Sequence, residues 1–592
     1  MTATKPRSVE RWVPGARVLR TYEKQWLRAD LVAGVVLAAI LVPQGMAYAE
    51  LAGLPAVTGL YTTIACLVGY AIFGPSRILV LGPDSSVSPL IFAAIVPLLA
   101  DGDPATAIAL AGMMALMVGL IEIGLGLGKL GFVADLLSKE VQVGYMNGLA
   151  ITIIVGQLPK LFGFSTEGDT FIEDVKAFFQ GLDQTDATTL AVGLACLLVL
   201  LGLPRLTRRV PAVLVAVIGA TVVSAVLGLA EQGVKTVGAL PQGVPTPAFP
   251  WTSISDVGPL LIAAVGITLV SLTDTIATST AFAARRGDEV EPDQEMIGIG
   301  AANLAAGFFQ GFAVSTSSSR TAVAEQSGAK SQVTGLVGAG LVAILLLFLN
   351  GLLADLPQTT LAAVVIVAAL SLMDFGILRR YFQVRKSALA LSLVATGGVV
   401  LFGVLWGIAL AVILAILMFF RRNWWPNGAV LAPVEGVPGW HSIDTYPDAP
   451  QLPGILVYRW EAPLFFANAG IFRQQIRRLV RDSQPDWVVL QCEAITDIDV
   501  TAAEMLEQLD NELNSIGVHL AFAELRDRLQ DLVRRYGLLE TLDRERFYPT
   551  LKAAVREIEE LGPLPPAEEL PGGHGHRHHK PGRHHPDGAP KT

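Results

Sequence analysis

Long apolar runs alternate with short polar breaks over most of the chain. Runs such as IALAGMMALMVGLIEIGLGLG (108–128) and LVGAGLVAILLLFLNGLL (336–353) leave almost no polar face on a helix. A stretch of about 20 such residues spans the hydrocarbon core of a bilayer, so we predict about 14 crossings or half-crossings. They lie near 29–47, 55–73, 85–100, 105–127, 140–160, 187–205, 210–229, 257–284, 293–312, 316–328, 332–353, 360–378, 386–403 and 404–421.

The pattern changes near Asn423 and divides the chain into five regions. Residues 1–28 form a polar, basic entry segment, and residues 29–422 form the transmembrane domain. Residues 423–452 are expected to be a linker. Strand and helix patterns alternate over 453–562, which predicts a small α/β domain. Residues 563–592 are rich in Pro, Gly and His without periodicity, so we expect a disordered tail.

Two predicted segments are too short and too polar to cross a membrane alone. GPDSSVSPLIFAAIVPLLA (82–100) and STSSSRTAVAEQSG (315–328) each begin with serines, which favour helix starts over helix interiors. Ser88 and Ser318 are 230 residues apart, as are Gln44 and Asp274 on the first helix of each half. Interrupted segments at matching places indicate a site between inverted repeats. Two facing half-helix N-termini would attract an anion.

Composition and charge support a membrane protein. Of the 592 residues, 52% are hydrophobic and only 16% are charged, whereas a soluble enzyme carries about 25% charged residues. Three isolated cysteines exclude a disulfide framework, and no nucleophile–base or nucleotide motif predicts an enzyme or a nucleic-acid partner. The polar breaks that would lie on the same side as both termini are rich in Lys and Arg, so the positive-inside rule places the termini in the cytoplasm. These breaks contain Arg77, Lys129, Lys139, Arg205, Arg285, Arg286, Arg379, Arg380 and Lys386.

Two long motifs resemble a known family. VPQGMAYAELAGLPAVTGLYTTIACLVGYAIFGPSRILVLGPDSSVS (42–88) and QEMIGIGAANLAAGFFQGFAVSTSSSRTAVAEQSGAKSQVTGLV (294–337) resemble signature regions of the SulP anion permeases, and the C-terminal region resembles a STAS domain. The resemblance implies a polytopic α-helical membrane protein with 7+7 inverted transmembrane repeats, core and gate domains, a cytoplasmic STAS domain and a homodimeric assembly.

The resemblance also implies a function. We expect a secondary active transporter of inorganic anions in a bacterial inner membrane, with sulfate as the favoured substrate and H⁺ or Na⁺ as the coupled ion. A bicarbonate or C4-dicarboxylate symporter and an uncoupled anion channel or exchanger are the alternatives. Apart from a possible Na⁺, no cofactor is expected.

Asp274 is the candidate coupling residue because an acid at membrane depth usually marks an ion pathway. Thr278 lies one turn further on the same face. Together the carboxylate and the hydroxyl would suit Na⁺, or Asp274 could carry a proton. The alternative is a structural role, in which neighbouring hydroxyl groups form hydrogen bonds with a buried Asp274. Gln44 and Tyr48 match family positions that line the anion pocket.

The two half-helix starts supply the other candidate anion ligands. Arg320 matches a family arginine and would add positive potential, or pair with Asp274 or Glu325. Asp84 is expected to cap the first half-helix. Backbone N–H groups on one side and N–H plus hydroxyl groups on the other would face the anion. These donors belong to Ser86, Val87 and Ser88, and to Ser317, Ser318 and Ser319.

The C-terminal domain contains one candidate regulatory residue. In ITDIDVTAAEML (495–506), Thr501 falls where related STAS regulators are phosphorylated. Val500 and Ala502 depart from that pattern, and the alternative is that Thr501 caps a helix.

Overall fold

The computed structural model describes residues 13–99, 103–131, 138–166, 170–207, 211–542 and 546–561. The chain forms two compact units, Met1–Ile416 and Leu417–Thr592. The predicted tail, 563–592, and residues 1–12 of the entry segment lie outside the described residues.

Each of the predicted membrane segments coincides with a helix, and seven helical spans within the described residues are long and apolar enough to cross a membrane. Amphipathic helices α2 (Pro14–Thr21), α8 (Phe171–Gln180) and α16 (Phe375–Val384) accompany them. The first half contains α3 (Trp26–Leu51), α4 (Ala56–Phe73), α5 (Ser88–Ile95), α6 (Pro104–Leu127), α7 (Lys139–Phe162), α9 (Ala187–Leu206) and α10 (Ala212–Leu227). The second half contains α11 (Ile254–Arg286), α12 (Pro292–Phe308), α13 (Ser318–Gln326), α14 (Val333–Phe348), α15 (Gln358–Leu372), α17 (Lys386–Phe402) and α18 (Val404–Trp424).

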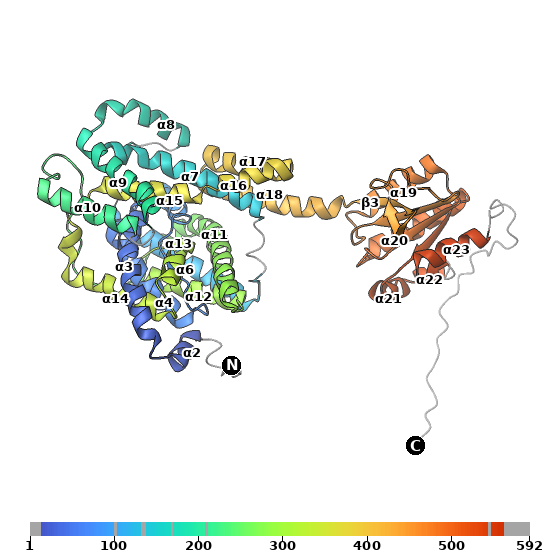
Figure 1. Cartoon of the computed structure of the whole chain (residues 1–592), viewed down its shortest axis with the longest axis horizontal. Helices are drawn as coiled ribbons and strands as arrows, with labels where there is room; N and C mark the ends of the chain where they lie inside the picture. Colours follow the sequence, from blue (N-terminus) through green and yellow to red (C-terminus); the bar gives the residue numbers. More distant parts are fainter. Residues whose placement is uncertain are drawn as a thin grey trace, which may run out of the picture. The chain divides into compact units, whose positions relative to one another are not determined.

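These helices pack into two interleaved groups (Figure 1). Helices α3 to α6 pack mainly with α11 to α14, while α7, α9 and α10 pack with α15 and α17. Each group therefore takes equivalent helices from both halves, as core and gate domains require. Glycines allow the closest approaches: a Cβ on Gly59 of α4 would lie 1.9 Å from the carbonyl oxygen of Gly45 on α3. Small residues at such crossings bring helix backbones together in membranes.

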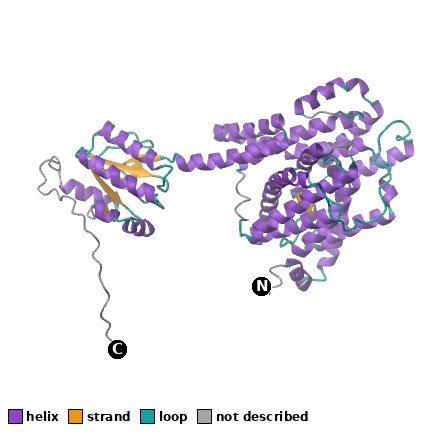
Figure 2. Ribbon diagram, turned by 180° about the vertical axis from the view of Figure 1, so that it is seen from behind, coloured by secondary structure: helices purple, strands orange, loops and turns teal. Residues whose placement is uncertain are grey.

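A two-stranded sheet lies among these helices (Figure 2). Strand β1 (Leu81–Gly82) pairs antiparallel with β2 (Ser315–Thr316), and each strand leads into a half-helix. Helices α5 and α13 begin at Ser88 and Ser318, as the sequence predicts. Five residues, 83–87, connect β1 to α5, whereas Ser317 alone connects β2 to α13.

The second unit is a six-stranded sheet with helices. The strand order is β4-β3-β5-β6-β7-β8, and β5 (Ile455–Trp460), β6 (Trp487–Gln491), β7 (His519–Ala523) and β8 (Phe547–Tyr548) run parallel. Strand β6 is buried at every position, which is typical of a parallel sheet covered on both faces. The helices are α19 (Ala469–Ser483), α20 (Val500–Ser515), α21 (Asp527–Arg535), α22 (Leu538–Thr541) and α23 (Leu551–Leu561).

The prediction of a linker over 423–452 is wrong. Helix α18 continues to Trp424, and β3 (Gly428–Val434) and β4 (Val437–Ser442) form a hairpin at the sheet edge. Strand β3 also pairs with β5. The Gly and Pro residues of this segment are typical of loops, so its sequence pattern does not predict strands. Strand β3 forms because its backbone pairs with β5.

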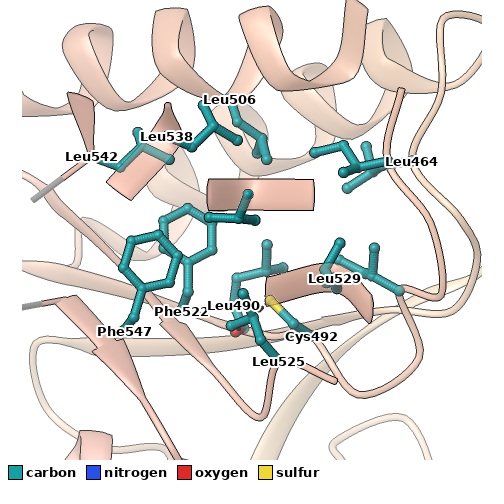
Figure 3. Close-up of a pocket in the computed structure, with 13 residues that line it drawn as sticks. Leu464, Leu490, Cys492, Leu506, Phe522, Leu525, Leu529, Leu538, Leu542 and Phe547 are labelled. Carbon is teal, nitrogen blue, oxygen red and sulfur yellow. Dashed lines mark hydrogen bonds between the residues drawn. The ribbon is translucent and has the colours of Figure 1, made fainter. Parts of the chain in front are cut away.

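A cavity of about 20 Å³ lies inside this second unit (Figure 3). Side chains from β6, β7, α20 and α21 line it, including Leu490, Phe522 and Leu529, and so does Cys492, which directly follows β6. A single water needs roughly 10–15 Å³ and several polar partners. Because the lining is apolar, the cavity is a small packing gap and offers nothing to hold a polar ligand.

Candidate functional site

Helix α13 presents free donors at its start. The Oγ of Ser317 accepts a hydrogen bond from the backbone N–H of Arg320 at 3.4 Å and caps the helix. Ser318 and Ser319 are exposed, and the described part of the chain offers no acceptor to their backbone N–H groups. The positive end of the helix dipole and two free N–H groups therefore coincide here.

Helix α5 differs from this arrangement because Asp84 already occupies its start. The carboxylate Oδ1 of Asp84 accepts the N–H of Ser86 at 3.0 Å. The carbonyl oxygen of Asp84 accepts the N–H groups of Val87 at 3.3 Å and Ser88 at 3.0 Å. These three N–H groups, which we predicted to face an anion, are thus bound within the chain. Val87 is the N-cap residue of α5, so the expected side-chain cap by Asp84 is also wrong.

Arg320 is a buried cation beside Asp84. Its side chain is 1% exposed, and its Nη2 lies 3.5 Å from Oδ2 of Asp84. Among the described residues, no acceptor forms a hydrogen bond with its Nε or Nη1. Glu325 forms ion pairs with Arg285 and Arg286 instead. Arg320 therefore pairs with neither of the partners considered from the sequence, because the connection before α5 brings Asp84 to it.

Asp274 on α11 contacts the same connection. Its Oδ2 lies 2.9 Å from the Oγ of Ser86, and its Oδ1 accepts a hydrogen bond from the Nε2 of Gln142 at 3.5 Å. The hydroxyl of Tyr145 donates to the carbonyl oxygen of Ser86 at 3.0 Å. Helices α7 and α11 thus meet the residues before α5 at one point.

Thr278 binds the other half-helix. Its Oγ1 lies 2.7 Å from the Oγ of Ser318, so this hydroxyl links α11 to the start of α13. The hydroxyl of Thr278 is therefore bonded to Ser318 and not to Asp274. One turn earlier, Thr275 Oγ1 lies 2.9 Å from Thr316 Oγ1 on β2. Helix α11 is therefore bonded to both half-helix starts, with Asp274 toward α5 and Thr278 toward α13.

The two predicted residues of α3 lie differently. Tyr48 is 4% exposed and close enough to Asp84 and Arg320 to interact with both electrostatically. Gln44 is half-buried and takes no part in the hydrogen bonds described above. The structure thus brings Tyr48, and not Gln44, to the charged pair.

Sequence reasoning missed Glu122. This residue of α6 is fully buried and accepts hydrogen bonds from the Oγ of Ser271 at 2.9 Å and the Nδ2 of Asn303 at 2.7 Å. Ser271 lies three residues before Asp274 on α11. The signal was present, because Glu122 is a single acid inside an apolar run, as Asp274 is.

The second unit corrects one further prediction. The N-cap of α20 is Asp499, whose Oδ1 accepts the N–H of Ala502 at 2.8 Å. Its Oδ2 accepts the N–H of Phe466 at 2.8 Å. Thr501 lies exposed one position inside the helix, so it is not the cap. A carboxylate two residues earlier bonds better because it reaches two backbone donors at once.

Sequence comparison identifies both units. The sulfate permease family matches residues 27–395, and the STAS domain matches residues 446–554. A protein of Mycobacterium tuberculosis named a probable sulfate transporter is 42% identical over 547 residues, which cover 92% of this chain and 98% of that protein. The chloroplastic sulfate transporter 4.1 of Arabidopsis thaliana is 29% identical over 564 residues, covering 92% of this chain and 82% of the plant protein.

Solved structures share the fold. The murine solute carrier 26 family member A9, in an inward-facing state, superposes with a TM-score of 0.86 at 24% identity, covering 94% of this chain and 96% of that one. The transmembrane domain of the cyanobacterial bicarbonate transporter BicA gives a TM-score of 0.59 at 23% identity, covering 67% of this chain and 98% of that one. The family match over most of the chain and the mycobacterial relative lead to one conclusion: this chain belongs to the sulfate permease family, a family of membrane transporters and not of enzymes.

Proposed function

We propose that this protein is a secondary active transporter that carries sulfate and couples it to protons. The observation that carries this proposal is the meeting of three features: free N–H groups at the start of α13, the buried Arg320, and Asp274. The names of the relatives at 42% and 29% identity support sulfate as the substrate.

The anion is proposed to bind at the start of α13. The N–H groups of Ser318 and Ser319 point outward from the positive helix end, with two serine hydroxyls beside them. Arg320 adds positive potential from below the surface, because its guanidinium is buried and only partly paired. Backbone donors and a nearby cation suit an oxyanion with several acceptor oxygens.

The proton is preferred over Na⁺ because of how Asp274 and Thr278 are bonded. A hard cation collects several oxygen ligands around itself. Here Asp274 faces the hydroxyl of Ser86 and the amide nitrogen of Gln142, and the hydroxyl of Thr278 is bonded to Ser318. Among the described residues, Ser86 is the one hydroxyl oxygen bonded to Asp274, so these partners do not form the oxygen cage that Na⁺ would need.

We further propose a homodimer in a bacterial inner membrane, with both termini and the STAS domain in the cytoplasm. Arg17, Arg77, Lys129 and Arg286 line one hollow in the first unit, which acidic residues also line, and the positive-inside rule counts the Lys and Arg residues. This clustering at one end of the helices supports the positive-inside assignment.

The test is uptake of radiolabelled sulfate into proteoliposomes under imposed pH or Na⁺ gradients. An inward proton gradient should drive accumulation, and excess bicarbonate should compete poorly. Asp274→Asn should abolish gradient-driven accumulation and keep sulfate exchange between the two sides. Accumulation driven by Na⁺ alone, or stronger competition by bicarbonate than by unlabelled sulfate, would contradict the proposed ion or substrate.

A further inference from the structure

The hydroxyl of Ser86 stands between two carboxylates. Its Oγ lies 2.9 Å from Oδ1 of Asp84 and 2.9 Å from Oδ2 of Asp274. A serine hydroxyl has one hydrogen, so it can donate to only one of these oxygens. The second 2.9 Å contact is a hydrogen bond only if the other carboxyl group carries a proton. We propose that Asp84 is a second coupling residue, which shares one proton with Asp274 through the hydroxyl of Ser86.

The partners of each carboxyl group assign the proton within this bridge. Asp84 accepts the N–H of Ser86 and faces the guanidinium of Arg320, and both contacts favour the ionised form. Among the described residues, Asp274 has only the long contact from Gln142 on its other oxygen. The proton therefore resides on Asp274, which donates to Ser86, and Ser86 donates to the ionised Asp84.

The other groups around the bridge leave this assignment unchanged. Tyr145 on α7 and Tyr48 on α3 lie within electrostatic range, and the hydroxyl of Tyr145 already donates to a backbone carbonyl. The thiol of Cys66 on α4 lies within range of Arg320. Glu122 on α6 is bonded to Ser271 and Asn303. Arg320, on α13, is the positive charge that faces the bridge among the described residues of these elements.

Counting charges links the proton to the anion. With the proton bound, the charges of Arg320 and Asp84 sum to zero and Asp274 is neutral, so no net negative charge opposes an anion at the start of α13. Without it, the group carries a net negative charge, and the oxygens of Ser86 and Asp274 repel at 2.9 Å. Protonation and anion binding therefore strengthen each other, and the linkage must be reciprocal. This inference rests on the proposed proton-coupled transport.

The experiment is sulfate binding to the purified full chain, measured by calorimetry at constant Na⁺ between about pH 5.5 and pH 8. In the wild type, sulfate affinity should fall by up to about tenfold for each unit that the pH rises, because one proton is linked to binding. Asp84→Asn and Asp274→Asn each leave one carboxylate to balance Arg320. Both variants should bind sulfate with less than about twofold dependence on pH, because neither needs the shared proton.

Matched variants keep the test decisive. Glu295→Gln neutralises another fully buried carboxyl group, bonded to Tyr70 and Ser76, and should retain the wild-type pH dependence. If Asp84→Asn does not fold, Ser86→Ala removes the bridge and keeps both acids. It should move the midpoint of the pH dependence by at least about one unit, while Ser86→Thr restores it. Ser224→Ala, at a buried hydroxyl in α10, is its control.

Each outcome decides between the two proposals. Sulfate binding that does not depend on pH in the wild type overturns both. Dependence that Asp274→Asn loses but Asp84→Asn keeps overturns the shared proton alone and leaves proton coupling at Asp274. An unchanged midpoint in Ser86→Ala also overturns the bridge.

Discussion

Replacing Ser318 tests whether the start of α13 binds the anion. Ser318 is the first residue of the helix, it is exposed, and its Oγ is bonded to Thr278 at 2.7 Å. Ser318→Ala removes one hydrogen bond and keeps every backbone donor. A hydroxyl that donates to the anion contributes about 1 kcal/mol, so sulfate affinity should fall by about fivefold at most, because this hydroxyl is also bonded to Thr278.

Ser318→Asp is expected to be far more severe. Two unit charges about 4 Å apart repel by about 4 kcal/mol at an effective dielectric constant of about 20, which corresponds to a loss of about a thousandfold. A carboxylate at the first position of a helix stabilises that helix. Folding should therefore be preserved while the anion is excluded.

Ser318→Asn is the matched control because it has the size of Asp without the charge. We expect its sulfate affinity to stay within about tenfold of the wild type, because the change alters one or two hydrogen bonds and no charge. Calorimetry on the purified variants at one fixed pH gives all three affinities. Wild-type affinity in Ser318→Asp would refute the reasoning, because the anion would then have to bind away from this helix end.

Three further predictions address packing, the STAS domain and the tail. Gly59→Ala should lower the melting temperature of the detergent-solubilised protein by several degrees, since the new Cβ would meet the carbonyl of Gly45 at 1.9 Å; an unchanged melting temperature would show that α3 and α4 are further apart. In the second unit, a 2.6 Å bond from Arg477 leads the contacts that lower the pKa of Glu512. Glu512→Gln should cost that unit about 0.5–1 kcal/mol at pH 7. This stabilisation is present above the unfolded pKa of about 4.3 and lost as the pH falls through the lower folded pKa, so urea unfolding of the wild type and the variant should converge in acid. Deleting residues 563–592 should leave sulfate uptake unchanged, and a loss of uptake would give that segment a role.

The apolar runs predict the membrane unit well because a bilayer imposes both length and polarity on each segment. The starts of α5 and α13 were predictable from Ser88 and Ser318, since a serine cluster between apolar runs has few other uses. The hairpin of β3 and β4 was not predictable from local pattern. Strand β3 is defined by pairing with β5, which follows it in the sequence, and β4 is defined by pairing with β3.

The site was predictable in its members but not in its bonds. Asp274, Ser318 and Arg320 were found as unusual residues inside apolar segments, and the structure brings them to one region. The partner of Arg320 is Asp84, 236 positions earlier, and this contact depends on the path of residues 83–87. No periodicity reports such a path, because it is irregular backbone.

The connections that follow β1 and β2 differ in length, and they mark a place where the two halves of the membrane unit are not equivalent. The connection from β1 to α5 is four residues longer than the connection from β2 to α13. Asp84 and Ser86 lie in the longer connection. A symmetric framework treats both sides of a membrane alike and suits an exchanger that runs equally well in either direction. The longer connection gives one half a carboxylate that the shorter one lacks, so under the proposed mechanism a shortened connection should leave simple exchange.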